Sequence, residues 1–138
     1  MFNPSSDLIA IQNILRADAK LLRLMNLEGK SEIEVIKKII TKSKWDDLVT
    51  GERRLCFYFL PSIPMPNKAF FQNVIEFDCH VPSDDEVYGY RILEQVHELI
   101  YKKKVNNRPM YFEGQLGELA TLQGFFCCAS RYAFSRII

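Results

Sequence analysis

The residues of this chain that could act as nucleophiles or as acid–base groups are Cys56, Cys79, Cys127, Cys128, His80 and His97. A thiol dyad of Cys79 or Cys127 with either histidine would support nucleophilic catalysis, because such pairs form in space rather than along the chain. The sequence indicates no third residue that would orient the histidine. A zinc site from Cys79, His80 and the adjacent cysteines would lack the ligand spacing of structural zinc sites. We therefore expect reduced, partly buried structural thiols, typical of a reducing compartment such as a cytoplasm.

The acidic residues cluster at Asp46–Asp47 and at Asp84–Asp85–Glu86. Such carboxylates bind a metal ion only together with a partner cluster, whereas acidic residues at the start of a helix complement its dipole. The chain contains no G-x-S-x-G sequence, glycine-rich phosphate loop, H-E-x-x-H sequence or EF-hand spacing. The sequence therefore predicts no catalytic, metal or cofactor site, and we expect that the protein is not an enzyme.

The elements that would position these residues begin with two helices, predicted at residues 6–28 and 31–41. Leu8, Ile11 and Leu15 recur at helical spacing, and Ser31 with Glu34 forms a capping-box pattern. Residues 41–54 are polar and include Trp45, which we interpret as an anchor for a connecting loop.

From Leu55 onward the hydrophobic period changes to two, which predicts strands at 54–60 and 72–81. A helix is predicted at 84–104, and two further strands at 109–113 and 124–136. Because each pair of strands is close enough to form a hairpin, we expect an α+β domain over residues 1–138. It would have a four-stranded antiparallel sheet (β-β-α-β-β), with the N-terminal helices and the main helix packed on one face. The first and last strands are apolar on both faces, which is typical of a sheet that contacts other subunits.

The composition is that of a soluble folded domain, with 138 residues, 48% of them hydrophobic and 25% charged. No apolar run reaches the roughly 18–20 residues of a membrane span, and the first residues lack the pattern of a secretory signal. The formal net charge is +1, so charge alone predicts no nucleic-acid partner. Residues 51–100 sum to −4 and residues 101–138 to +4, so copies could attract one another head to tail, although the same charges could simply cap helices.

A nucleic-acid-binding module remains an alternative from another functional class. Lys102–Lys104 with Tyr101, and Arg131 with Tyr132, are basic–aromatic combinations that could contact phosphates and bases. Phe125 and Tyr58 could act as exposed sheet aromatics. The glycine-aromatic pattern of RNA-recognition modules is absent, however, and assembly with other protein subunits is the favoured interpretation.

Five segments together resemble the tail-terminator (tail-to-head joining, tail completion) proteins of long-tailed bacteriophages. These segments are RRLCFYFLPS, NVIEFDCHVPSDDEVYGYRILEQVHELIYKKKVNN, MYFEGQLGEL, GFFCCASRYAFSRII and the N-terminal helix. By order of elements the resemblance covers about residues 5–138. Helix 31–40 and the proline-rich arm 61–69 have no assigned counterpart in that family.

The resemblance implies a structural virion protein of the tail and neck that assembles in the host cytoplasm. Its subunits would form a hexameric ring that caps the tail tube, ends tube polymerisation and joins the tail to the neck. The partners implied are further copies of the chain, the major tail-tube protein and a head-completion protein, while DNA only passes through the lumen. Another ring of the head–tail connector is the alternative within this class. The expected contact residues are Pro64, Met65, Pro66, Lys68, Phe70 and Phe71 in the arm, and Gln115, Leu116 and Glu118 in a second loop.

Overall fold

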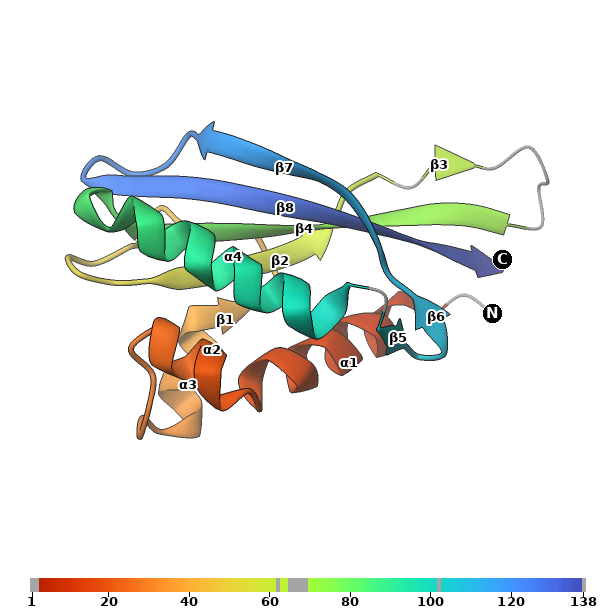
Figure 1. Ribbon diagram of the computed structural model, residues 1–138, viewed down its shortest axis with the longest axis horizontal. Coiled ribbons are helices and arrows are strands. Elements are labelled where there is room, and N and C mark those ends of the chain that lie inside the picture. The colour runs from red at the N-terminus through yellow and green to blue at the C-terminus, as the bar shows by residue number, and fades with distance from the viewer. Residues whose placement is uncertain (1–2, 62, 65–69, 102, 138) are drawn as a thin grey trace.

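The structure, a computed structural model, describes residues 3–61, 63–64, 70–101 and 103–137 (Figure 1). Its helical segments are α1 (Pro4–Arg16), α2 (Ala19–Leu24), α3 (Glu32–Lys38), the short 3-10 helix η1 (Ser83–Asp85) and α4 (Glu86–Ile100). Its strands are β1 (Ile39–Ile40), β2 (Arg54–Phe59), β3 (Ile63–Pro64), β4 (Phe70–Pro82), β5 (Lys104–Val105), β6 (Arg108–Pro109), β7 (Tyr111–Leu119) and β8 (Phe125–Ile137). Within the described part of the chain, every helix is too short or too polar to cross a membrane.

The main sheet has the strand order β1-β2-β4-β8-β7, and β3 adds to β4 beside this path. The α+β class predicted from the sequence is confirmed. The prediction of a four-stranded, purely antiparallel sheet is wrong at one edge, because β1 pairs with β2 in parallel and makes the sheet mixed. This strand comes from the end of the predicted helix 31–41. The branched pair Ile39 and Ile40 is extended instead, and the Arg16 guanidinium donates hydrogen bonds of 2.6 and 3.2 Å to the Ile39 carbonyl.

The predicted helix 6–28 is two helices, divided at Asp18. The Asp18 carboxylate accepts a hydrogen bond of 2.9 Å from the Leu21 backbone N–H and so caps α2. A short acidic side chain that can bond to nearby backbone offers the chain an alternative to continuing the first helix. The apolar spacing on both sides of Asp18 hid this break, since α1 and α2 both contribute to the core.

The other predicted boundaries differ mainly around residues 101–119. The predicted helix 84–104 begins with η1 and ends at Ile100, and β5 and β6 then form a small hairpin. Its turn residues Asn106 and Asn107 have φ of 51° and 64°, the conformation that a two-residue hairpin turn requires. The glycine-bearing segment 114–117, expected to be a loop, lies inside β7, whose pairing with β8 shifts register at two places. Strands β4 and β8 are 13 residues each and continue beyond the helical layer (Figure 1).

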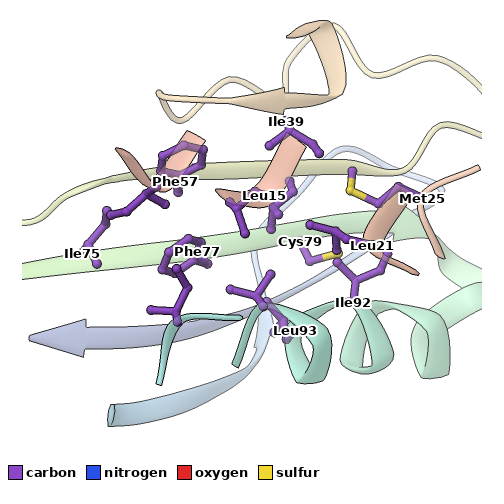
Figure 2. Packing of buried hydrophobic residues seen from close by; sticks show 14 of the residues in the cluster. Leu15, Leu21, Met25, Ile39, Phe57, Ile75, Phe77, Cys79, Ile92 and Leu93 are labelled. Carbon is purple, nitrogen blue, oxygen red and sulfur yellow. The ribbon is translucent and has the colours of Figure 1, made fainter. Parts of the chain in front are cut away.

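The hydrophobic core lies between the helices and one face of the sheet, called here the helix-covered face. Figure 2 shows Leu15 of α1 near Phe57 and Ile39, and Leu21 of α2 beside Cys79 and Ile92 of α4. The predicted alternation of β4 is confirmed on this face, where Ile75, Phe77, Cys79 and Val81 are all buried. The residues between them point to the opposite, open face of the sheet.

Candidate functional site

The open face of the sheet carries a cluster of polar side chains from β2, β4 and β8. Glu76, Asp78 and His80 alternate with core residues along β4, yet they are only 5, 6 and 1% exposed. In the register of the sheet, Glu76 of β4 lies opposite Tyr58 of β2 on one side and opposite Arg131 of β8 on the other. Charged groups are almost never buried to this extent unless they are paired, so their hydrogen bonds decide what the cluster can do.

The tyrosine and the two carboxyl groups share a short hydrogen-bond chain. Tyr58 Oη lies 2.9 Å from Glu76 Oε2 and 2.5 Å from Asp78 Oδ2, and Arg131 Nε donates to Glu76 Oε1 at 2.6 Å. A tyrosine hydroxyl has one proton to donate, so it can serve only one carboxylate as donor. The second contact is satisfied when one of the two carboxyl groups is protonated.

The electrostatics of the cluster indicate that the protonated group is Asp78. Burial, with hydrogen bonding to Glu76, raises the pKa of Asp78 to about 8. Burial also raises the pKa of Glu76, but hydrogen bonds from Asp78, Arg131 and Tyr58 outweigh it and leave the Glu76 pKa below its ordinary value. Burial raises the pKa of Tyr58, and its two acidic neighbours raise it further. At neutral pH the cluster therefore holds one ionised carboxylate, paired with Arg131, and one neutral acid.

Of the thiol dyads considered from the sequence, the structure brings together Cys127 and His80. Cys127 Sγ lies 3.8 Å from His80 Nε2, and His80 Nδ1 lies 2.8 Å from Thr121 Oγ1, so a third residue does orient the ring. Burial lowers the pKa of His80 to about 4 and raises that of the Cys127 thiol. Both groups are therefore neutral at pH 7, whereas a cysteine nucleophile needs a thiolate. Both are also almost fully buried, which gives a substrate no access.

The remaining sequence candidates for chemistry have structural partners. Cys79 points into the core, on the face opposite His80. His97 Nδ1 lies 2.7 Å from the hydroxyl of buried Tyr132. Asp47 pairs with Arg54 at 2.6 Å and Asp85 with Arg53 at 3.2 Å, so both acidic clusters tie loops to the sheet. Among the residues that the structure describes, no group of three or more potential ligands could hold a metal ion.

The predicted loop anchor, Trp45, stacks on the buried His80 ring with the centroids 6.2 Å apart. The segment 41–51 is held further by Arg54, which donates to Glu52 Oε2 at 2.7 Å and to the Lys44 carbonyl at 2.8 Å. This segment and Thr121 close over the His80 end of the open face. The sequence alone did not show that the polar side chains of the open face would form a cluster.

A second feature is a groove between α4 and the edge strand β7, called here the α4–β7 groove. It has a volume of about 290 Å³, at the lower end of ligand-site volumes, which begin at roughly 300 Å³. Its lining residues are Tyr90, Leu93, Glu94, His97, Phe112, Gln115, Ser130 and Tyr132. Partial desolvation raises the pKa of Tyr90, and interactions with Cys128, Glu86 and Glu118 raise it further. The groove thus combines aromatic walls with an acidic border.

A third feature lies at the opposite edge of the sheet, around α3 and the loop after β1. Ile33 and Ile36, one turn apart on α3, are 66% and 41% exposed, and Val49 of the loop is also exposed. The hollow beside them, of about 510 Å³, is lined by five basic and two acidic side chains, which leaves a net charge of +3. We call Ile33, Ile36, Lys37, Lys42 and Val49 the α3 surface. Single exposed apolar residues are common, but three together with unbalanced charge mark a contact surface.

The expected contact residues fall on two structural features. Pro64 pairs with Phe71 between β3 and β4, and Phe70 begins β4. Met65, Pro66 and Lys68 lie outside the described residues. In the second group, Gln115 and Leu116 belong to β7, with Glu118 exposed beyond them on the same strand. Gln115 lines the α4–β7 groove.

Of the features considered for nucleic-acid binding, Arg131, Tyr132 and Tyr58 are engaged within the sheet, while Lys102 lies outside the described residues. Tyr132 is fully buried, Arg131 is paired with Glu76, and the Tyr58 hydroxyl is bound between two acids. Base stacking needs an exposed aromatic face beside free basic groups.

Comparison with known proteins adds no family: no protein-family model matches the chain, and no curated protein matches it significantly in sequence.

Proposed function

We propose that this protein is a structural subunit that assembles with copies of itself into a ring, and that the ring is the tail terminator of a long-tailed bacteriophage. The proposal combines the sequence resemblance described above with one structural observation. The α4–β7 groove and the α3 surface are unlike each other and lie at opposite edges of the sheet. A closed ring of identical subunits needs two different, complementary surfaces on each subunit.

The proposed mechanism is geometric. A hexameric ring would present one face to the last ring of the tail tube and another that cannot accept a further tube ring. That second face would bind the head-completion protein of the neck, and DNA would pass through the central hole. The projecting ends of β4 and β8, with β3 beside them, lie outside the helical layer and are suited to contact such a neighbour (Figure 1).

Another ring of the head–tail connector would use the same surfaces, so the experiment must distinguish the two positions. Electron microscopy of phage particles lacking the protein makes this distinction. Tails of irregular or excessive length, unattached to filled heads, are expected for a terminator. Filled heads that leak DNA, beside tails of normal length, would instead indicate a head-completion ring. Normal joined particles would rule out both positions.

A further inference from the structure

We propose that the α3 surface of one copy docks into the α4–β7 groove of the next copy, and that this contact joins neighbouring subunits. The inference rests on the proposed function only in assigning the contact to a ring, since the two surfaces are defined by the fold itself. It commits to a second copy of this chain as the occupant of the groove.

The receiving groove has the border of a site for a basic partner. Glu86, Tyr90 and Glu94 are spaced by four residues on α4, so they share one helix face. Glu118 adds an exposed carboxylate on β7, the strand that forms the other side of the groove. The residues that line the groove include Glu94 but no lysine or arginine. A groove with an apolar floor and an acidic border favours a partner surface that has an apolar ridge with basic side chains beside it.

The α3 surface has the matching character. Ile33 and Ile36 form a short apolar ridge on α3, and Lys37 follows directly on the same turn. Lys42 lies on the adjoining loop. No described residue forms an ion pair with Lys37 or Lys42, whereas Lys38 is already bound to Glu52 at 3.0 Å. Lys37 and Lys42 therefore have charge available for a partner's carboxylates.

The sizes of the two surfaces also agree. A volume of about 290 Å³ accommodates a few side chains and excludes a helix or a large cofactor as a whole. The exposed isoleucine ridge is of that scale. Phe112, which is exposed at the groove, would be covered in the contact together with the ridge. Burial of these apolar groups supplies affinity, and the charges around them select the orientation.

The topology allows both surfaces to be used at the same time. β1, which follows α3 directly, is at one edge of the sheet, and β7 is at the other. In Figure 1, α3 lies below the sheet and β7 above it. One copy can therefore bind a neighbour on each side, which is the head-to-tail arrangement that closes into rings.

Cysteine cross-linking tests this contact in the whole chain, because the four native cysteines are all buried. The Ile33→Cys and Gln115→Cys variants are purified separately, mixed, and treated with a short bismaleimide. We expect dimer yield in the mixture to exceed that of either variant alone by about fivefold, because a head-to-tail contact brings unlike positions together. The matched control replaces Ile33→Cys with Ile9→Cys, since Ile9 is a similarly exposed isoleucine (56%) on α1. A yield no higher than this control would overturn the proposal.

Charge reversal provides the second measurement, with the same reagents. Glu94→Lys is added to the Gln115→Cys variant, so that the attraction between Glu94 and Lys37 of the next copy becomes a repulsion. Losing the attraction and adding the repulsion each change the affinity by a factor of roughly 2 to 5 at a surface, so we expect about a tenfold lower yield of cross-linked dimer. Lys37→Glu in the Ile33→Cys variant should restore most of it. An unchanged yield after the Glu94 reversal, or no rescue, counts against the proposed pairing. Normal particles without the protein would refute the phage function but not the contact, so the two failures can be distinguished.

Discussion

The most informative single substitution is Asp78→Asn on the open face of the sheet. Asp78 has a pKa of about 8 in the folded protein, against about 3.9 for an unfolded chain. Between these values the folded state holds a proton that the unfolded state has released. Stability therefore falls as pH rises through this window. An asparagine keeps the shape of the protonated acid and can donate to Tyr58, but it cannot ionise, so the variant should lose this pH dependence.

The size of the effect follows from proton linkage. A full difference of one bound proton changes the free energy of unfolding by about 1.4 kcal/mol per pH unit. His80 complicates the range below pH 6.5, because it is neutral in the folded state and stability there rises with pH. Above pH 6.5 the effect of Asp78 on the free energy of unfolding is no longer opposed by that of His80. Allowing for the proton that Asp78 shares with Glu76, we expect about 1–2 kcal/mol between pH 6.5 and pH 8.

The assay is urea unfolding at four pH values from 6.5 to 8, followed by circular dichroism. We compare the free energy of unfolding of Asp78→Asn with that of the unmodified protein. The variant's value minus the unmodified protein's value should rise by about 1–2 kcal/mol from pH 6.5 to pH 8. Asp46→Asn makes the same chemical change at an exposed carboxyl group and should give a flat difference. A flat or falling difference for Asp78→Asn would refute the assignment of a neutral acid at this position.

Three further outcomes are expected. His80→Gln should remove about 1–2 kcal/mol of acid sensitivity between pH 6.5 and pH 5, measured by the same unfolding assay, because burial keeps His80 neutral when folded. Gly89→Leu should lower stability by about 1–3 kcal/mol in urea titrations, since a Cβ there would lie 3.2 Å from Cys128 Sγ and 3.3 Å from Val81 Cγ2. Thiol reagents should label the native protein only at its unfolding rate, because all four cysteines are buried.

Much of the fold could be predicted from hydrophobic periodicity. The alternation around Ile75 and Phe77 identified the central strand, and the helical spacing after Glu86 identified α4. The helix break at Asp18 was indicated only by this acidic residue, which interrupts the apolar stripe, because the helical spacing resumes beyond it. The strand at Ile39–Ile40 depends on a partner far along the chain, since its carbonyl is bound by Arg16 and its register is set by β2.

The candidate surfaces were only partly accessible from the sequence. Gln115 and Glu118 were expected to make contacts, but as parts of a loop, because glycines at 114 and 117 suggested a turn rather than a bulged edge strand. The spacing of Glu86, Tyr90 and Glu94 was a readable signal that the helix prediction did not use. The volume of the groove between α4 and β7 could not be predicted from the sequence, since it depends on where α4 packs on the sheet.

The two faces of the sheet explain how residue types that can act in catalysis are used in packing here. On the helix-covered face, apolar packing determines how α4 lies against the strands. On the open face, Glu76, Asp78 and His80 occupy alternate positions of the same strand, and each has a hydrogen-bond contact with a neighbour: Arg131, Tyr58 and Thr121. Such a network is costly when incomplete, so it specifies one register for the long β4–β8 pair. A rigid sheet with a fixed register holds its two edges at a constant separation. Repeated head-to-tail docking between those edges requires this constancy, because the angle between neighbouring subunits determines whether a ring closes.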